Sequence, residues 1–475
     1  MTSSRRNRND HDAGIGGAHR VDRWLPLLPL ICALFYAPLA FGGTTQQTAS
    51  IIDALLFASF AGWLIGLLLF LRLPSLPGVF WGSIGVLLVI GGCAIANPGF
   101  VRVPGSWQLL PIQEEQWLIP STVDQKTSLA SMIHWGALLS AVVVVADLSS
   151  HRGVRWLLLK MVALSGLLVS LVGILQKAAE SDAMLWATSE ESGKVFFGAF
   201  RYHTNAAAFL AMSWPASAAL WIRSFSTRGH PILRSLWFIS FFFTWLGMFV
   251  NTSKIGHLVA LGGVAILVVA FRKTFFQSSY TAVQKLLSAM VLLVMGVCAV
   301  YPAFSLISDR WAEAVTTGGS LSGRLNAYSA CTEAIAEGGI WGYGPGTFSL
   351  IFPYFTGASM EALGGFWRHA HQDYLQFLIE WGWGGFVTVA VLVFGGVWIG
   401  CRIVRDAHQE GRKDISATIG LMALGSVLLI AAFDFPLQIP AIQLLFVVYL
   451  AGMWARGGGK EVAPYSATES EPQVA

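Results

Sequence analysis

The chain has 475 residues, of which 55% are hydrophobic and only 12% are charged. That charged share is about half of what is usual in a soluble domain, so composition excludes a disordered chain, a basic nucleic-acid-binding protein and a water-soluble enzyme. A mean hydropathy of +0.61 indicates a polytopic membrane protein. For such a protein the net charge of +4 matters less than the side of the membrane on which each Lys and Arg lies.

Residues 1–22 are polar, which predicts a disordered N-terminus. From residue 23 to residue 456 the chain contains apolar runs near the length of about 20 residues that crosses a bilayer. The first run has no clear cleavage site after it, so we interpret it as an uncleaved helix. The remaining segment, 457–475, is again polar and is expected to be disordered. We predict an all-α bundle of about twelve spans, near 24–42, 50–71, 77–96, 128–147, 154–175, 204–222, 235–251, 255–271, 285–304, 373–400, 416–433 and 437–455.

The distribution of cations predicts the orientation of this bundle. If the N-terminus is cytoplasmic, most of the 30 Lys and Arg fall in short inner loops or near the inner ends of spans. We therefore expect both termini in the cytoplasm. The few cations left on the outer side include Arg201, Lys254, Arg324 and Arg368.

Three outer segments, about 97–127, 176–203 and 305–372, are too long to be simple turns. The last is the largest and lies between predicted spans nine and ten. Its arginine and histidine content is unusual for an exterior that is otherwise poor in cations. We therefore expect this loop to fold as a cap over the outer end of the bundle.

The order of residues within this loop predicts its local structure. Ser322-Gly323-Arg324 begins a helical stretch that continues to about residue 337, and Gly338-Gly339 ends it. The glycine-rich residues 341–346 predict turns. The aromatic segment 348–355 has the composition of a helix that lies along the membrane interface.

Cysteine and histidine spacing gives no reason to expect a metal or another cofactor. The five cysteines are scattered among apolar spans and loops, with neither a disulfide framework nor zinc-ligand spacing. The pair His369-x-His371 lacks a third ligand at a clear spacing.

His371 is the strongest candidate for chemistry. At helical spacing it shares a face with Leu375, Leu378, Gly382 and Gly385, and the two glycines would let a neighbouring helix approach closely. A helix N-terminus disfavours a cationic imidazole, so a histidine at the outer start of this helix should be neutral and able to accept a proton. Two interpretations stay open at this point, a general base and a hydrogen-bonded structural histidine.

The outer cations suggest the ligand of such a base. Several fixed cations near one histidine suit a phosphate or pyrophosphate, which arginine binds bidentately. The alternative for each cation is a contact with lipid phosphate. Because ATP is absent outside the cytoplasm, the energy must come with the substrate, as it does in a lipid-linked sugar diphosphate. The candidate carboxylates for orienting the histidine, among which the sequence does not choose, are Asp373, Glu361, Glu333 and Glu337.

At these residues the sequence resembles the O-antigen ligase and polymerase superfamily of bacterial envelope enzymes. His371-Gln372, nine further residues, Gly382, two residues and Gly385 agree with the ligase pattern. The large outer loop between spans nine and ten is also similar, as are its arginine at 324, the glycines of 342–346 and the Asn205 segment. The superfamily often has Ser-Arg where this chain has Ser253-Lys254.

The resemblance implies a metal-independent glycosyltransferase of GT-C-like fold in the bacterial inner membrane, with its active site facing the periplasm. The donor would be an undecaprenyl-diphosphate-linked glycan, and the acceptor a glycan or lipid A-core, both reached among membrane lipids. His371 would deprotonate an acceptor hydroxyl, while Arg324, with Lys254 or Arg201, would bind the diphosphate. Direct attack would invert the anomeric carbon. The resemblance adds Asn205, Gln372, Arg368 and His369 as further site candidates.

Two alternatives remain open. A polymerase of the same superfamily would extend lipid-linked repeats, for example of an exopolysaccharide, instead of ligating a finished glycan. A transporter or flippase would carry ionisable groups near the bilayer midplane. Charges within the spans are scarce and polar residues gather at the outer end, which favours an enzyme.

Overall fold

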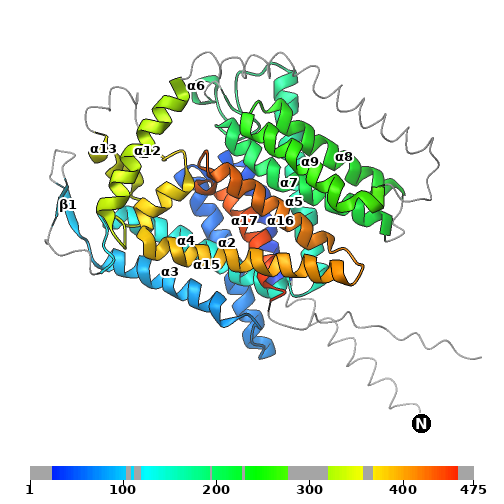
Figure 1. Ribbon diagram of the computed structural model, residues 1–475, viewed down its shortest axis with the longest axis horizontal. Helices are drawn as coiled ribbons and strands as arrows, with labels where there is room; N and C mark the ends of the chain where they lie inside the picture. Colours follow the sequence, from blue (N-terminus) through cyan, green and yellow to red (C-terminus); the bar gives the residue numbers. More distant parts are fainter. Residues whose placement is uncertain are drawn as a thin grey trace, which may run out of the picture.

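The computed structural model describes residues 24–102, 109–111, 119–192, 195–226, 231–275, 319–356 and 367–457. These residues are almost entirely helical, which confirms the predicted all-α class (Figure 1). The exception is a short antiparallel hairpin of β1 (Phe100–Arg102) and β2 (Leu109–Pro111). The predicted disordered ends, 1–22 and 457–475, lie outside the described residues apart from residue 457.

The predicted spans agree with the described helices. Every predicted span coincides with a helix except the ninth, 285–304, which lies outside the described residues. By length and composition, seven of the described helices could cross a membrane, and three shorter helices, including Trp24–Leu39, are also apolar. The other helices are η1 (Phe41–Gly43), α2 (Gln46–Phe70), α3 (Gly78–Ala96), α4 (Gln125–Leu148), α5 (Arg152–Ala178), α6 (Ser189–Ser192), α7 (His203–Ser226), α8 (Pro231–Val250), α9 (Lys254–Phe275), α12 (Gly319–Gly338), α13 (Phe348–Phe355), α15 (Asp373–Gln409), α16 (Ile415–Ala431), η4 (Pro436–Gln438) and α17 (Pro440–Trp454).

Helix α7 occupies the centre of the bundle. It is rich in alanine and serine, and its residues 204–220 are all buried. Small side chains let the backbones of α5, α8 and α16 approach it closely. Its buried face places the start of α7, at His203, against the segment that follows α16.

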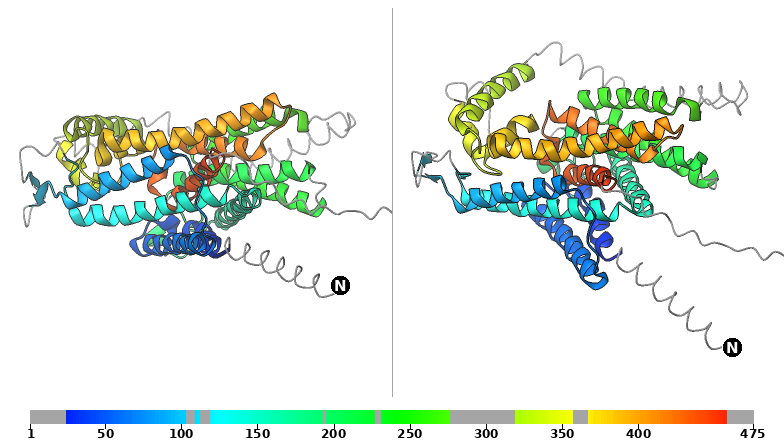
Figure 2. Two further views of the ribbon diagram at one scale, coloured as in Figure 1. Left: turned by 90° about the horizontal axis from the view of Figure 1, so that it is seen from below. Right: turned by 60° about the horizontal axis from the view of Figure 1, so that its bottom comes forward.

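One end of the bundle carries a cap, which we define as residues 319–356. Helices α3, α4 and α15 lie side by side along the long axis, and α12, α13 and the hairpin gather at one end of them (Figure 2). The cap contacts the start of α4 through two hydrogen bonds. Val123 N–H donates to the Tyr343 carbonyl at 3.1 Å, and Ser128 Oγ donates to the Pro345 carbonyl at 2.9 Å. Residues 319–356 of the predicted cap, 305–372, are therefore folded against the bundle, while 305–318 and 357–366 lie outside the described residues.

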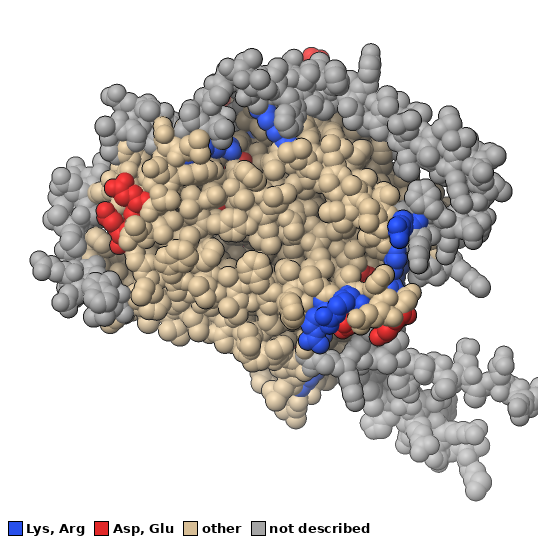
Figure 3. Space-filling view, viewed as in Figure 1, with Lys and Arg blue, Asp and Glu red and all other residues tan. Residues whose placement is uncertain are grey.

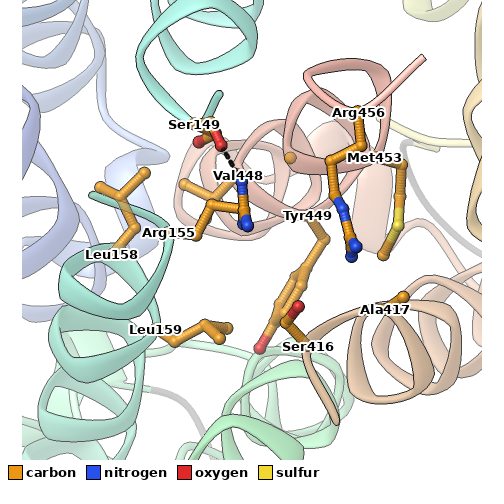
Figure 4. A pocket seen from close by; sticks show the side chains of 11 residues that line it. Ser149, Arg155, Leu158, Leu159, Ser416, Ala417, Val448, Tyr449, Met453 and Arg456 are labelled. Carbon is orange, nitrogen blue, oxygen red and sulfur yellow. Dashed lines mark hydrogen bonds between the residues drawn. The ribbon is translucent and has the colours of Figure 1, made fainter. Parts of the chain in front are cut away.

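The opposite end of the bundle holds cations that the sequence places on the cytoplasmic side. At the end of α4, Asp147 pairs with Arg72 at 2.7 Å and accepts from Trp63 Nε1 at 2.8 Å. Arg155 donates to the Ser149 carbonyl and points into a small hollow of about 40 Å³ that Arg456 also lines (Figure 4). Between the two ends, the face seen in Figure 3 shows almost no charge, as a lipid-facing band should.

The cap is seated on a break in α15. Gly382 adopts φ 59° and ψ −170° within this helix, and a Cβ there would lie 2.2 Å from the Ile340 carbonyl oxygen. Tyr343 and Gly344 N–H groups donate to the carbonyls of Ile379 and Glu380, each at 2.9 Å. The expectation that Gly382 admits a neighbouring helix was wrong, because it admits the loop of the cap instead.

The elements of the cap match the predicted order. Helix α12 ends at Gly338, followed by Gly339 with φ 60°, and Gly342, Gly344 and Gly346 all have positive φ, as the predicted turns require. Helix α13 covers the predicted aromatic segment. It buries Phe348, Ile351 and Phe352 in a small apolar core of the cap, so one face packs on protein rather than on lipid.

Candidate active site

His371 lies immediately before α15, at the junction between the cap end and the bundle. The helix begins at Asp373 with Gln372 as its N-cap, so His371 is not part of the helical face that its spacing suggested. Its backbone has φ 53°, a conformation unusual for a residue other than glycine. The Tyr328 hydroxyl of α12 donates to the His371 carbonyl at 2.9 Å. This contact helps to hold the strained residue in place, and strain of this kind clusters at functional sites.

The imidazole of His371 pairs with Asp434. His371 Nδ1 and Asp434 Oδ1 are 3.1 Å apart, and the carboxylate is only 3% exposed whereas the imidazole is 28% exposed. An ionised carboxylate can only accept, so Nδ1 carries the proton and Nε2 keeps its lone pair. No described residue forms a hydrogen bond with Nε2. The arrangement presents a free basic nitrogen whose ring is oriented by a buried acid.

The residue that orients His371 was missed by the sequence reasoning. Asp434 follows α16 in the turn before η4, 63 residues from its partner. One signal was present in the sequence, because Asp434 is the single charged residue between Ile415 and Trp454. A lone carboxylate in so apolar a stretch requires a buried partner.

None of the described carboxylates that the sequence suggested orients His371. Asp373 instead accepts from Leu437 N–H at 2.8 Å and from Gln438 Nε2 at 3.0 Å. Glu333 and Glu337 are exposed on α12, and Glu361 lies outside the described residues. Asp373 therefore fastens the turn that carries Asp434 to the start of α15.

Two further glutamine contacts strengthen this region. Gln372, a predicted site residue, donates to the Ala432 carbonyl at 3.3 Å, which ties the start of α15 to the end of α16. Gln376 accepts from Ala370 N–H at 3.2 Å and donates to Glu380 at 3.1 Å. Buried Glu380 in turn accepts from Gly346 N–H of the cap at 3.0 Å. The loop that contains His371 is thus connected to both the bundle and the cap.

Aromatic rings surround the imidazole. The rings of Phe435 and His371 form a T-shaped pair with centroids 4.8 Å apart. The rings of Trp367 and His371 form a second T-shaped pair with centroids 5.3 Å apart. Tyr202 and His369 stack on Phe435 at 5.8 and 4.5 Å. Rings of this kind form a platform on which the apolar face of a sugar ring can pack.

His369 is a neutral member of this aromatic group. Burial lowers the pKa of its imidazole to about 4, and the nearby Arg368 guanidinium acts in the same direction. Its Nδ1 is buried without a hydrogen bond to any described residue. Within the described part of the chain, no group of three or more His, Cys, Asp or Glu side chains is placed to hold a metal ion.

Arg324 is the cation that contacts the site most directly. From α12 its Nη1 donates to the Phe433 carbonyl at 2.9 Å, next to Asp434. Burial raises the pKa of the Tyr202 hydroxyl, as does the Asp434 carboxylate, while hydrogen bonds from Thr204 and Arg324 oppose this rise. The structure therefore brings the predicted Arg324 together with the Asp434 turn and with Tyr202.

The start of α7 brings two more predicted residues near the site. Arg201 is exposed and adjoins Tyr202, whose ring lies 6.4 Å from that of His371. Asn205 is buried, with an Oδ1 that accepts no hydrogen bond from the described residues. These residues lie at the start of α7 beside Tyr202 but do not bond to the imidazole.

Lys254 and Arg368 lie farther from direct contact. Asn251 Nδ2 donates to the His203 carbonyl at 2.8 Å, which places the α8–α9 turn, and Lys254 at the start of α9, beside the start of α7. Arg368 is exposed three residues before His371. Among the described residues, no hydrogen bond or ion pair joins Lys254, Arg201 or Arg368 to His371 itself, so their role depends on a bound ligand.

A largely apolar cavity of about 360 Å³ extends beneath this region between α4, α15, α16 and α17. Its polar lining comes from Asp373, Tyr374, Gln438 and Gln443. The rest is apolar or aromatic and follows α15 as far as Phe394. The cavity could therefore accommodate a hydrocarbon chain whose polar end lies near His371.

Comparison with known proteins supports the superfamily resemblance. Residues 239–390 match the family model described as O-antigen ligase. No curated protein matches the chain. The matched segment contains Lys254, Arg324 and His371 but ends before Asp434. Together with the apolar helices, the match indicates a multi-pass bacterial inner-membrane protein and a ligase- or polymerase-type enzyme acting on lipid-linked glycans.

Proposed function

We propose that this protein ligates a glycan to an acceptor sugar. The proposal starts from the match of residues 239–390 to the O-antigen ligase family model. The donor is an undecaprenyl-diphosphate-linked glycan, and the acceptor is a sugar hydroxyl of a glycan or of lipid A-core. The observation that carries the proposal is the His371–Asp434 pair, with Nδ1 bound at 3.1 Å and Nε2 open to a ligand. This is the geometry of a general base with an orienting acid.

The reaction follows from the placement of these groups. His371 Nε2 takes the proton of the acceptor hydroxyl as its oxygen forms a bond to the anomeric carbon of the donor. The bond between that carbon and the diphosphate oxygen breaks, and the diphosphate leaves with the electron pair. Asp434 stabilises the imidazolium that forms. Because one displacement occurs, the anomeric configuration is inverted.

The leaving diphosphate requires positive charge. Arg324 is anchored beside Asp434 through the Phe433 carbonyl, and its remaining donors can bind phosphate oxygens. Lys254 or Arg201, both bordering the start of α7, would supply a second charge. This positive charge binds the diphosphate of the bound donor and also stabilises the charge that develops on it as it leaves.

The cavity under the site suits the lipid part of the donor. The cavity has a volume of about 360 Å³ and is lined mainly by apolar side chains of α4, α15 and α17. A prenyl chain placed there would bring its diphosphate to the level of Asp373 and Tyr374, at the start of α15. The cations at the far end, such as Arg72 and Arg155, support an orientation with that end in the cytoplasm and His371 facing the periplasm.

The test is the replacement His371→Ala in cells that make the glycan. We expect the variant to reach the membrane, lose transfer and accumulate lipid-linked glycan. The matched control is His408→Ala, which changes a histidine in the last turn of α15 at the far end. Normal envelope glycan in the His371 variant would overturn the catalytic assignment.

The same experiment separates ligase from polymerase, because the two share the chemistry at His371. A lost ligase leaves long glycans on the lipid carrier, whereas a lost polymerase leaves single repeats. The length of the accumulated glycan, read on a gel after mild acid release, therefore decides between the two.

A further inference from the structure

Three polar side chains meet inside the bundle, away from the reacting atoms. His134 Nδ1 of α4 lies 2.6 Å from Asp53 Oδ1 of α2. Its Nε2 lies 2.7 Å from Gln443 Oε1 of α17. The Asp53 and His134 side chains are only 12% and 19% exposed. An ionisable pair within membrane-spanning helices is costly, so its presence calls for an explanation.

The hydrogen bonds define where the protons are. Gln443 Nε2 donates to the Leu437 carbonyl at 2.7 Å, so the amide oxygen must face His134. If the amide were reversed, two acceptors would meet at Leu437. His134 Nε2 is therefore protonated and donates to Gln443. Nδ1 forms the second hydrogen bond of the ring, with the Asp53 carboxyl, so both ring nitrogens of His134 are engaged.

The network ends at the turn that carries Asp434. Leu437 lies in η4, three residues after Asp434. Its carbonyl is held by Gln443 at 2.7 Å, and its N–H is held by Asp373 at 2.8 Å. One peptide segment is thus fixed from α17 on one side and from α15 on the other. Any movement of this turn would change the distance from Asp434 to His371.

The three residues differ from several hydroxyl side chains of the bundle, which donate to their own helix. The hydroxyl groups of Ser140, Ser213 and Thr244 donate to carbonyls of their own helices, so their hydrogen bonds are made within one helix. Asp53, His134 and Gln443 instead connect α2, α4 and α17 in one series, and their last donor serves the Leu437 carbonyl. Such a connection is expected of groups that support an active-site residue.

We propose that Asp53, His134 and Gln443 are positioning residues, which fix Leu437 and so hold Asp434 against His371. The inference rests on the proposed function, because it assigns these residues to the transfer reaction. They do not contact the reacting atoms. Their effect passes through the Asp434 carboxylate to the proton on His371 Nδ1, and hence to the lone pair on Nε2.

The test compares two Gln443 variants of the full chain in detergent with a matched control and with Asp434→Asn. Gln443→Leu removes both hydrogen bonds, and Gln443→Glu keeps the acceptor for His134 but donates to Leu437 only if protonated. The matched control is Tyr449→Phe, which removes a different buried hydrogen bond of α17, that from the Tyr449 hydroxyl to the Met212 carbonyl at 2.7 Å. Figure 4 shows Tyr449 among the residues of the opposite end.

The first readout does not need the substrate. Diethyl pyrocarbonate acylates a free imidazole lone pair, and mass spectrometry of the His371 peptide gives the rate at this histidine. We expect Gln443→Leu to slow acylation by about threefold or more, because His371 loses its fixed tautomer. Asp434→Asn should slow it as well, and Tyr449→Phe should leave it unchanged. If Gln443→Leu does not accumulate in the membrane, Gln443→Glu gives the same comparison.

The second readout is transfer from the lipid-linked donor. Both Gln443 variants should lower kcat by about tenfold, because Gln443 acts on the base. Gln443 also lines the proposed donor cavity, so the comparison uses kcat at saturating donor rather than KM. Acylation at the wild-type rate in the Gln443 variants, with slowing in Asp434→Asn, would overturn the positioning role. Absence of transfer by the wild-type protein would instead count against the proposed function, and the acylation result would still stand.

Discussion

Asp434 Oδ1 lies 3.1 Å from His371 Nδ1, although 63 residues and all of α15 and α16 separate the two in sequence. The carboxylate also accepts from Phe435 N–H at 3.1 Å. It therefore has a fixed direction as well as a buried position, and the imidazole is oriented by a group that cannot easily rotate. This pair is the part of the site on which the proposed chemistry depends most.

The first prediction concerns that carboxylate. Asp434→Asn is nearly isosteric, yet its amide can donate to Nδ1 and so favour the wrong tautomer of His371. We expect kcat to fall by at least about 100-fold, as removal of an orienting acid does elsewhere, with the protein still present in the membrane. Steady-state transfer by purified protein measures this, and a loss smaller than about threefold would contradict the role of Asp434.

The second prediction concerns Arg324. Arg324→Lys keeps the charge but loses the planar fork, and Arg324→Ala loses both. We expect KM for the lipid diphosphate donor to rise by about tenfold in the lysine variant and further in the alanine variant. Arg405→Lys is the matched control, because Arg405 is an exposed arginine of α15 whose ion pair within the described part of the chain is with its neighbour Asp406. Equal donor affinity in all variants would exclude Arg324 from diphosphate binding.

The third prediction concerns pH and His369. Burial lowers the pKa of this histidine from 6.5 to about 4. Below pH 6.5 the unfolded chain therefore binds a proton that the folded protein does not bind until the pH approaches 4. The free energy of unfolding should therefore decrease as the pH is lowered through this window, by on the order of 2 kcal/mol at pH 5. His369→Gln should lose less stability than the wild type between pH 7 and pH 5 in thermal unfolding, and equal losses would argue against a neutral buried His369.

The sequence predicted the elements of the cap well because their signals are local. Glycines mark the end of α12 and the turns at 342–346, and the aromatic run predicted α13 at Phe348–Phe355. The choice of His371 as the candidate base also came from a motif close to it. Hydropathy alone placed most of the helices, since a lipid-facing span must be apolar along its length.

What the sequence did not predict depends on contacts between distant residues. Nothing near His371 points to Asp434, and nothing near Gln443 points to His134 or Asp53. Periodicity also misled the interpretation of α15. Gly382 keeps helical spacing with Gly385, but its φ of 59° interrupts the helix so that Ile340 can approach. Spacing describes a regular helix and cannot show where tertiary contacts break it.

The fourth prediction tests this break. Gly382→Ala would place a methyl group 2.2 Å from the Ile340 carbonyl oxygen at a backbone φ of +59°. We expect a destabilisation of about 2 kcal/mol or more, visible as a lower Tm in detergent. Gly425→Ala in α16 is the control, because a Cβ there meets no atom within 4 Å, and it should be neutral or slightly stabilising. Similar effects of the two changes would show that the seat of the cap on α15 is not tight.

The last prediction concerns the cavity under the site. Ala390 of α15 lines it, whereas the adjacent Val391 is 42% exposed on the surface of the bundle and does not. Ala390→Trp should fill much of the cavity and raise KM for a donor with a full-length prenyl chain by about tenfold, while a donor with a short prenyl chain should be affected much less. Val391→Trp adds the same ring outside the cavity and should leave both donors unaffected. Because His371 is unchanged in each variant, kcat at saturating donor should stay within about twofold of the wild type. Equal effects of Ala390→Trp on the long and short donors would place the prenyl chain outside this cavity.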